Sequence, residues 1–274
     1  MAYKRILTVQ DISCIGQCSM TVALPILSAC GHETCILPTA ILSTHTGGFG
    51  KPAVQHLSDL AGDAQRHWQE NHIDFDAVYV GYLGSIGAID AVNCIIDTML
   101  APGGKVIVDP AMADHGKLYS GLDEAYAKAM QELCERADVM IPNITEAAMM
   151  TGMPYRETYD ESYISQLLNK LQGRDVVLTG VSYDPSQTGI AIRVKGETAY
   201  YQHVRVGKNY HGTGDMFAAC FVGAWMQDKQ IEEAVEIAAQ FTLRCIQNTY
   251  ENPAHWYGVK FETALPWLIG KLFG

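Results

Sequence analysis

The sequence His211-Gly212-Thr213-Gly214-Asp215 stands directly before the most apolar stretch of the chain, residues 216–226. Two glycines at the start of a helix let backbone N–H groups approach an anion, and the helix dipole adds about half a positive charge there. Asp215 falls in the first turn of this expected helix, where its carboxylate is placed to take a proton from a hydroxyl that attacks phosphorus. The motif therefore indicates base-assisted phosphoryl transfer. The alternative is a simple turn whose aspartate complements the helix dipole.

The composition limits the class of protein that carries this motif. The chain has 274 residues, of which 48% are hydrophobic and 18% charged, as is typical of a folded globular protein. Its 19 basic and 30 acidic residues give a net charge of −11, which argues against non-specific nucleic-acid binding but not against a local phosphate site. We expect neither a signal peptide nor a membrane span, because no apolar run is long enough. The eight cysteines form no Cys-x-x-Cys pair, so we expect reduced thiols, no zinc site and a cytoplasmic protein.

Strand-like and helix-like segments alternate over most of the chain, which predicts a mostly parallel sheet with helices on both faces. We expect strands near residues 4–9, 33–37, 76–80, 105–110, 138–141 and 175–179, and a hairpin over 189–204. Helices are expected near residues 20–30, 52–71, 86–100, 123–136, 145–151, 161–171, 214–227, 231–248 and 261–273. No linker or repeat interrupts this pattern, so residues 1–274 are expected to form a single domain. Ligands of such sheets bind beyond the carboxyl ends of the strands, which favours the loops at 10–18, 81–85, 109–116, 142–146 and 179–188.

Six short motifs occur in the order found in a known superfamily. Gly212-Thr213-Gly214-Asp215 followed by Met216-Phe217-Ala218-Ala219 resembles the anion-hole motif of the ribokinase-like superfamily, and more specifically that of its pyridoxal kinase branch. The other segments that resemble this branch are Val9-Gln10-Asp11, Ser43-Thr44-His45-Thr46-Gly47, Gly81-Tyr82-Leu83-Gly84-Ser85, Val108-Asp109-Pro110-Ala111-Met112-Ala113-Asp114 and Pro142-Asn143-Ile144-Thr145-Glu146-Ala147. Each motif is weak alone, but six in family order span nearly the whole chain. The resemblance implies a ribokinase-like α/β fold.

The resemblance also implies the catalytic and phosphate-binding residues. Asp215 would be the catalytic base, and the N–H groups of Gly212, Thr213 and Gly214 would hold the transferring phosphoryl group. The implied cofactors are ATP and Mg²⁺; whether a monovalent cation is also needed stays open.

On the nucleotide side, Asp109 and Glu146 would bind the metal, and Asn143 would help to organise its waters and the nucleotide phosphates. Asn143 and Glu146 also have the spacing of a capping box, which is compatible with that role. Further positions that the resemblance brings near the nucleotide are Asp114, Thr179 and Lys208. The alternatives are a simple cap for Asp109 and a solvated surface charge for Lys208.

Five residues match family positions around the acceptor, a pyridine ring. They are Asp11, Ser13, His45, Thr46 and Tyr82. The aromatic side chain of Tyr82 would cover the face of the flat ring. The alternatives are a core tyrosine at a strand end for Tyr82, a structural loop histidine for His45, and a turn serine for Ser13.

Two positions depart from the pyridoxal kinase pattern. Pyridoxal kinases commonly carry serine where this chain has Asp11, and an ionised aspartate accepts hydrogen bonds but donates none. Asp11 therefore favours a protonated ring nitrogen or an amine, which brings pyridoxamine or a hydroxymethylpyrimidine into consideration. Leu42 stands where an aromatic residue is expected. Conversely, hydroxymethylpyrimidine kinases typically carry cysteine where this chain has Asp215, which favours the vitamin B6 branch.

The implied function is phosphorylation of the 5-hydroxymethyl group of pyridoxal, pyridoxamine or pyridoxine, in salvage of pyridoxal 5′-phosphate. A homodimer is implied by the same resemblance. Two alternatives stay open: a hydroxymethylpyrimidine kinase of thiamine synthesis, with or without dual activity, and a non-catalytic vitamer-binding protein that kept the fold.

Overall fold

The computed structural model describes residues 2–171, 173–207, 210–252 and 254–274. Its strands are β1 (Arg5–Ser13), β2 (Glu33–Leu42), β3 (Val54–His56), β4 (Phe75–Val80), β5 (Leu100–Val108), β6 (Ala113–Asp114), β7 (Lys117–Leu118), β8 (Val139–Met140), β9 (Asp175–Val181), β10 (Gln187–Val194) and β11 (Glu197–Val204). Nine of these form one sheet in the order β11-β10-β9-β8-β5-β4-β1-β2-β3. The central pairs from β9 to β2 are parallel, and the pairs β2–β3, β9–β10 and β10–β11 of this sheet are antiparallel. The mostly parallel sheet predicted from the sequence is confirmed.

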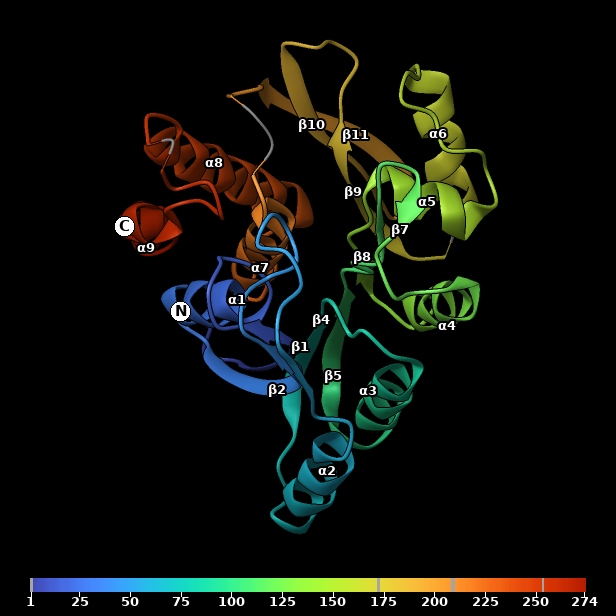
Figure 1. Cartoon of the computed structure of the whole chain (residues 1–274), viewed down its shortest axis with the longest axis vertical. Helices are drawn as coiled ribbons and strands as arrows, with labels where there is room; N and C mark the ends of the chain where they lie inside the picture. The colour runs from blue at the N-terminus through green and yellow to red at the C-terminus, as the bar shows by residue number, and fades with distance from the viewer. Residues whose placement is uncertain (1, 172, 208–209, 253) are drawn as a thin grey trace.

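Helices cover both faces of this sheet, as predicted. They are α1 (Met20–Ala29), α2 (Leu60–Glu70), α3 (Ile86–Met99), α4 (Glu124–Cys134), α5 (Ile144–Thr151), α6 (Glu161–Lys170), α7 (Thr213–Trp225), α8 (Ile231–Tyr250), the 3₁₀ turn η1 (Phe261–Ala264) and α9 (Leu265–Phe273). One apolar cluster contains α1, α7, α8 and α9, and a second contains α3 to α6 with the inner side of α2. Figure 1 shows these two groups on opposite sides of the strands.

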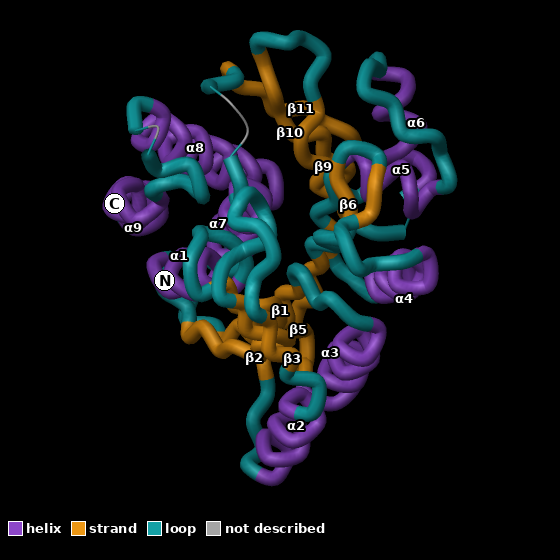
Figure 2. Tube along the Cα trace, viewed as in Figure 1, coloured by secondary structure: helices purple, strands orange, loops and turns teal. Residues whose placement is uncertain are grey.

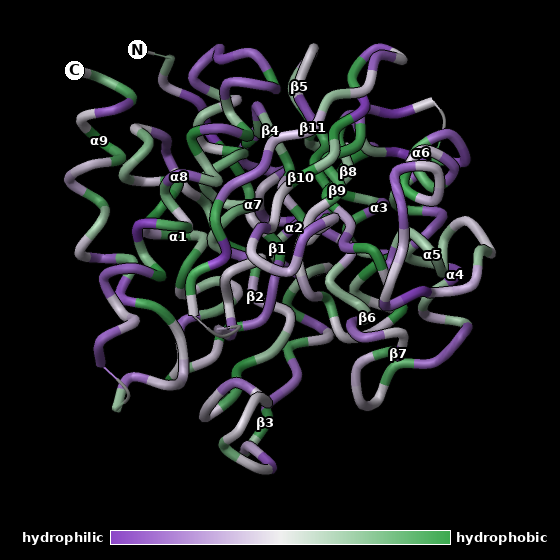
Figure 3. The backbone as a smooth tube through the Cα atoms, turned by 90° about the horizontal axis from the view of Figure 1, so that it is seen from above, coloured by the Kyte–Doolittle hydropathy of each residue, from purple (hydrophilic) through white to green (hydrophobic). Residues whose placement is uncertain are grey.

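The strands contribute side chains to both apolar clusters, because successive side chains point to opposite faces of the sheet. In β1, Ile6 belongs to the first cluster and Leu7 to the second; in β4, Tyr79 and Val78 divide in the same way. All four side chains are fully buried. Seen from above, the apolar green stretches gather around these central strands (Figure 3). A sheet buried on both faces explains why its strands have continuous apolar sequences.

Helix α7 is buried along nearly its whole length, from Met216 to Ala224. It packs closely on α1, because a Cβ added at Gly223 would lie 2.5 Å from the sulfur of Cys30. The carbonyl oxygen of Gly223 is also 2.9 Å from Nε2 of His32, a buried histidine. The apolar stretch next to the glycine motif is therefore a core helix, and its first turn is fixed against the sheet.

Three local predictions were wrong. Strand β1 continues to Ser13, with an irregular register between Gln10 and Ile12, so the start of the expected loop at 10–18 is strand. The helix expected over 52–71 begins only at Leu60, because residues 54–56 pair with the end of β2 as an edge strand. Strand β5 begins at Leu100 and includes the Pro-Gly-Gly sequence expected to precede it; the register shift between Phe75 and Ala77 accommodates this segment.

The hairpin predicted over 189–204 is confirmed as β10 and β11. Its turn residues Lys195 and Gly196 both have positive φ, 51° and 90°, as a tight two-residue hairpin requires. Within the described ranges, no helix is long and apolar enough to cross a membrane.

The contact between α1 and α7 gives a test of how tightly the core positions the first turn of α7. We expect Gly223→Ala to lower the free energy of unfolding by about 1–3 kcal/mol, because its methyl group overlaps Cys30. The matched control is Gly270→Ala in α9, where nothing lies within 4 Å and the substitution should stabilise by up to about 1 kcal/mol. Urea denaturation measures both. Equal effects of the two substitutions would contradict this account of the packing.

Candidate active site

The first turn of α7 lies against the loop that follows β1. Gly212 has a φ of 76°, and a Cβ added there would lie 1.8 Å from the carbonyl oxygen of Gln17. No side chain fits at this position, so glycine is required both for the left-handed backbone and for the contact. Figure 2 shows the loops around the start of α7 running side by side above the strands. This contact joins two segments almost 200 positions apart in the sequence.

Gly214 differs from Gly212 in its surroundings. Nothing lies within 4 Å of the position that its Cβ would occupy, and its φ is not left-handed. Neither packing nor backbone strain therefore explains the glycine. The open space lies beside the free N–H groups of the helix start, which is the arrangement that binds an anion. The neighbouring hydroxyl of Thr213 donates to the carbonyl oxygen of Tyr210 at 3.1 Å, which shapes the turn.

Asp215 lies in this first turn and is partly exposed. Burial of its carboxyl group raises its pKa to about 6; a hydrogen bond from the backbone of Ser19 lowers the pKa, and the charge of Asp11 raises it. At neutral pH the group is therefore mostly ionised, yet it is a stronger base than an exposed aspartate. A base of this strength suits proton removal near neutral pH.

Glu146 connects two neighbouring loops. Its Oε1 accepts hydrogen bonds from the N–H groups of Met112 (2.9 Å) and Ala113 (3.4 Å), and its Oε2 accepts one from the N–H group of Asn143 (2.8 Å). The side chain of Asn143 accepts from the Glu146 N–H at 3.0 Å, so the predicted capping box is confirmed. Burial raises the pKa of Glu146 to about 7 although these three bonds lower it. Glu146 thus holds the loop after β5 on the first turn of α5.

Asp109 follows β5 and is nearly buried, with 9% of its surface exposed. Its Oδ1 accepts a hydrogen bond from the N–H group of Ala111 at 3.2 Å, and Ala111 has the strained φ of 31°. Burial and then the charges of Glu146 and Asp215 raise the pKa of Asp109 well above its usual range. Carboxyl groups from the first turns of α5 and α7 therefore both act on the carboxyl group that follows β5.

This carboxylate cluster fits Mg²⁺. Hard cations take oxygen ligands, and a divalent charge would relieve the repulsion that raises the pKa of Asp109. Across the described ranges, no group of three or more His, Cys, Asp or Glu side chains is close enough to hold a metal alone. Bound Mg²⁺ commonly keeps several waters and phosphate oxygens as ligands, so the two carboxylates of Asp109 and Glu146 fit the role of its protein ligands.

Two of the other residues predicted near the nucleotide, Thr179 and Asp114, lie close to this cluster and differ in their exposure to solvent. The N–H group of Thr179 donates to the carbonyl oxygen of Pro142 at 2.9 Å, which pairs the end of β9 with Asn143. Asp114 is exposed in the small hairpin of β6 and β7, and its Oδ1 accepts from the N–H group of His115. Lys208, also predicted there, lies outside the described residues.

On the acceptor side, Asp11 and Ser13 are both buried at the end of β1. The hydroxyl of Ser13 donates to Oδ2 of Asp11 at 3.4 Å. Burial raises the pKa of Asp11, while the hydroxyls of Ser19 and Ser13 lower it. Tyr82 is half-buried nearby: burial and then the charge of Asp11 raise the pKa of its phenol. Asp11 thus contacts Ser13, and its charge acts on both Tyr82 and Asp215.

His45 has the hydrogen bonds of a structural histidine. Its Nδ1 accepts from the N–H group of Gly47 at 3.0 Å, so its Nε2 carries the proton and donates to the carbonyl oxygen of Tyr257 at 2.8 Å. No ring nitrogen of His45 is left for a ligand, which favours the loop alternative. Thr46 beside it is exposed.

Sequence reasoning missed an aromatic cluster at this end of the molecule. Phe49 packs on Trp256 with ring centroids 4.6 Å apart, and on His45 at 5.0 Å; His45 also lies 5.1 Å from His211. Gly47 permits this arrangement, because a Cβ there would meet the ring of His211 at 2.5 Å. No sequence pattern marks these contacts, because they join residues near 45 to residues near 211 and 256. The cluster joins the loop after β2 to the residues just before α7.

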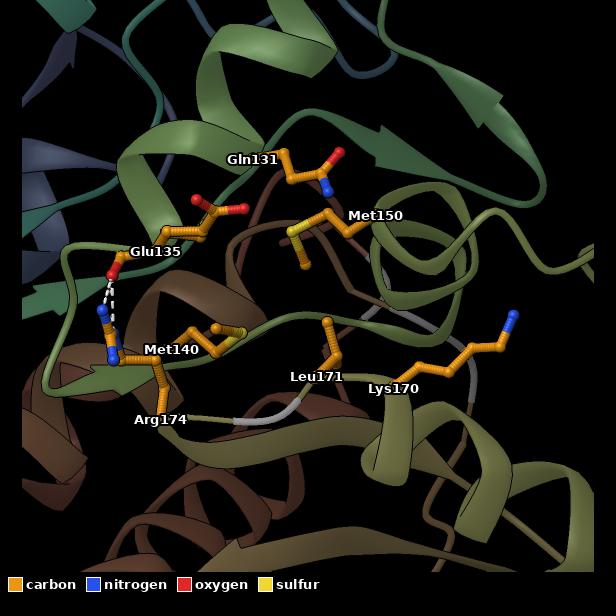
Figure 4. Close-up of a pocket in the computed structure, with 8 residues that line it drawn as sticks. Gln131, Glu135, Met140, Met150, Lys170, Leu171 and Arg174 are labelled. Carbon is orange, nitrogen blue, oxygen red and sulfur yellow. Dashed lines mark hydrogen bonds between the residues drawn. The ribbon is translucent and has the colours of Figure 1, made fainter.

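A separate hollow of about 290 Å³ lies near the amino-terminal ends of β8 and β9, where α4 and α6 lead into these strands. Figure 4 shows its wall, in which the guanidinium group of Arg174 donates to the backbone carbonyl of Glu135. None of the residues predicted for catalysis lines it; the lining residues are Gln131, Cys134, Glu135, Met140, Met150, Lys170, Leu171 and Arg174. The hollow is therefore separate from the carboxyl groups of Asp109, Glu146 and Asp215.

The sequence and the fold of this chain are both similar to those of known kinases. A family model described as phosphomethylpyrimidine kinase matches residues 24–259. The hydroxymethylpyrimidine/phosphomethylpyrimidine kinase of Bacillus subtilis is 30% identical over 177 residues, and the match spans 64% of this chain and 64% of that protein. The pyridoxine/pyridoxal/pyridoxamine kinase of Bordetella avium is 28% identical over 264 residues, 89% of this chain and 85% of that protein. The crystal structure of pyridoxal kinase from Lactobacillus plantarum has a TM-score of 0.91 and 32% identity, covering 98% of this chain and 97% of that one.

The raised pKa of Asp215 has a consequence for stability. The folded state holds the proton more tightly than the unfolded chain, whose aspartate has the ordinary value of 3.8. Its contribution to stability is therefore fully present below about pH 4 and is lost as the pH rises through about 6. We expect Asp215→Asn to gain stability relative to the wild type between pH 4 and pH 8 in metal-free buffer. Urea denaturation at both pH values measures this, and Asp90→Asn, an exposed carboxylate on α3, is the control. A pH-independent difference would contradict the raised pKa.

Proposed function

Because the chain belongs to the phosphomethylpyrimidine kinase family, we propose that it is an ATP-dependent kinase that phosphorylates the 5-hydroxymethyl group of a vitamin B6 vitamer, namely pyridoxal, pyridoxamine or pyridoxine. The observation that carries the proposal is the first turn of α7: a base with a pKa of about 6 stands beside an open, glycine-lined helix start. A base and an anion site side by side are what transfer of a phosphoryl group to an alcohol requires.

The family and the ribokinase-like fold implied by the six motifs are confirmed. Within this family, similarity to vitamin B6 kinases over nearly the whole chain supports the vitamin B6 proposal, as seen for the Bordetella avium and Lactobacillus plantarum proteins. A putative phosphomethylpyrimidine kinase of Bacteroides thetaiotaomicron covers 97% of the chain as well, and the chain spans 64% of the length of the hydroxymethylpyrimidine kinases of Bacillus subtilis and Haemophilus influenzae.

In the proposed mechanism, Asp215 takes the proton of the acceptor hydroxyl as its oxygen attacks the γ-phosphorus of ATP. The N–H groups of Gly212, Thr213 and Gly214 donate to the phosphoryl oxygens, whose charge they stabilise without reorganising. Asp109 and Glu146 would hold Mg²⁺, which when bound neutralises phosphate charge. Asn143 and Thr179 shape the adjoining loop for the nucleotide, and Asp114 and Lys208 are assigned to its periphery.

The same proposal includes the organisation of the protein. From the family resemblance we infer that residues 1–274 act as one domain, in a homodimer, in the cytoplasm. Light scattering of the purified protein after size-exclusion chromatography tests the dimer, since a 30.0 kDa chain should then have a mass near twice that value.

The second candidate function is a hydroxymethylpyrimidine kinase of thiamine synthesis. The observation in its favour is Asp11, a buried acceptor beside Asp215, which suits the exocyclic amine of a pyrimidine. ADP release with Mg²⁺-ATP distinguishes the two functions when pyridoxal, pyridoxamine, pyridoxine and hydroxymethylpyrimidine are each offered alone. Turnover of the pyrimidine only would assign the protein to thiamine synthesis. ATP binding without any turnover would favour the non-catalytic alternative.

Removal of the base should abolish most turnover. We expect Asp215→Asn to lower kcat by about 100- to 10,000-fold, because the amide cannot accept the hydroxyl proton. The affinity for the acceptor, measured by calorimetry, should change little. In the wild type, turnover should fall as the pH drops below about 6, where Asp215 takes up a proton. Near-wild-type kcat in the variant would contradict the base assignment.

Substitutions at Gly214 and Gly212 distinguish a glycine needed for ligand binding from a glycine needed for packing. We expect Gly214→Ala to keep or raise Tm, since nothing lies near the added methyl group, but to weaken ATP binding and turnover because the methyl group fills the anion space. Gly212→Ala should instead lower Tm sharply, because its Cβ collides with the backbone at Gln17. Thermal unfolding and ADP release are measured on both variants. Full activity of Gly214→Ala would argue against a phosphate site at this position.

A further inference from the structure

Gln17 lies in the loop after β1, and its side chain is bound by residues far along the chain. Its Nε2 donates to both carboxylate oxygens of Glu262, at 2.9 and 3.0 Å. An ionised carboxylate only accepts hydrogen bonds, so this contact fixes the orientation of the amide. The Oε1 of Gln17 therefore faces Nε2 of His255 at 2.8 Å, and that nitrogen carries the proton and donates. Both ends of the amide are thus held by one segment, residues 255–262.

The segment 255–262 is itself fixed by the core. Val259 is fully buried and Phe261 is 3% exposed, and both belong to the apolar cluster of α1, α7, α8 and α9. The N–H group of Lys260 donates to the hydroxyl of Thr249, a buried residue of α8, at 2.8 Å. The segment is therefore a firm support for the side chains that it presents to the loop after β1.

This segment supports both loops that contact the residues at the start of α7. On one side, Gln17 carries the carbonyl oxygen against which Gly212 packs, with no room for a Cβ. On the other side, the carbonyl oxygen of Tyr257 accepts from Nε2 of His45, whose ring lies 5.1 Å from that of His211. The start of α7 therefore contacts two loops that share one support.

We propose that Gln17 is a positioning residue for phosphoryl transfer. Its side chain links the segment 255–262 to the loop after β1, so that the backbone at Gln17 keeps Gly212 and the N–H groups of the helix start in their reactive geometry. This inference rests on the proposed kinase function for the reaction that it serves. Gln17 acts only through Gly212, and a small displacement of the helix start is enough to weaken catalysis, because transition-state donors must be held in place.

The experiment exchanges the two polar partners. Gln17→Glu keeps the size of the side chain but sets two carboxylates against each other, which breaks the contact. The double variant Gln17→Glu/Glu262→Gln restores it, because the amide is then supplied from the opposite side. The matched control is a second Gln–Glu pair, on α8, in which Nε2 of Gln240 donates to Oε1 of Glu236 at 2.8 Å. Gln240→Glu introduces the same repulsion there.

We expect Gln17→Glu to lower kcat/KM for ATP by about 10- to 100-fold, because the N–H groups that hold the phosphoryl group are displaced. The double variant should recover to within about 3-fold of the wild type, and Gln240→Glu should keep the wild-type value. Glu262→Ala removes the partner without adding a charge, so it should lower kcat/KM as well, and it tests the link if Gln17→Glu does not fold. All assays are run well below the lowest Tm of the set.

The pattern of loss and recovery distinguishes positioning from stability alone. A lower Tm in Gln17→Glu and Glu262→Ala with unchanged kcat/KM would overturn the proposal, because the contact would then only stabilise the fold. A loss of kcat/KM that the double variant does not recover would overturn it too, since the link between the two side chains would not be its cause.

Hydrogen exchange separates this inference from the proposed function. Exchange of the backbone amides of residues 212–216 is measured by mass spectrometry, with and without Mg²⁺-ATP. If the wild type turns over no acceptor, but exchange is faster in Gln17→Glu and slow again in the double variant, the support of the helix start by Gln17 stands and the kinase proposal fails. If the wild type phosphorylates a vitamer and neither turnover nor exchange responds to Gln17→Glu, the kinase proposal stands and the role of Gln17 is wrong. Neither turnover nor a difference in exchange would contradict both.

Discussion

The backbone contact between Gly212 and Gln17 is the constraint on which the candidate site depends. It brings the first turn of α7 against the loop after β1, with room for a hydrogen atom but not for a methyl group. Because α7 is buried along its length and wedged on α1 at Gly223, the position of that turn is set by the core. The carboxyl group of Asp215, the N–H groups of the helix start and the buried Asp11 are then fixed relative to one another. Preorganisation of this kind allows a site to stabilise charge without rearrangement during the reaction.

The second organising feature is the burial of acidic groups, which the fold stabilises unevenly. Glu146 receives three backbone N–H groups and is therefore partly compensated for its burial. Asp109 receives one, from the strained turn at Ala111, and Asp11 leaves one oxygen unpaired. The group with the most hydrogen bonds has a structural role, since it ties the loop after β5 to α5. Asp109 and Asp11, which receive fewer hydrogen bonds, keep more of their capacity for a cation or a ligand than Glu146 does.

The sequence alone predicted the architecture because its signals are local. Alternating strands and helices, the capping box at Asn143 and Glu146, and the hairpin turn at Lys195-Gly196 each depend on residues a few positions apart. The errors arose where a distant partner decided the outcome. Residues 54–56 form a strand only because the end of β2 offers an edge, and β1 runs to Ser13 only because β2 continues beside it. Neither effect leaves a mark within a short window of sequence.

For the candidate site the same division holds, with one further difficulty. Residue types at family positions made Asp109, Glu146 and Asp215 candidates for the site. The residue type alone does not say which hydrogen bonds a side chain already makes in the fold. His45 and Asp11 illustrate this: both matched positions around the acceptor, and both are buried. Both ring nitrogens of the histidine form hydrogen bonds, to Gly47 and Tyr257, whereas Oδ1 of the aspartate accepts none from the described residues. The hydrogen bonds in the folded structure therefore separate two residues that the sequence placed together around the acceptor. The histidine at a family acceptor position fixes a loop, whereas the aspartate that departs from the family pattern keeps unused hydrogen-bonding capacity.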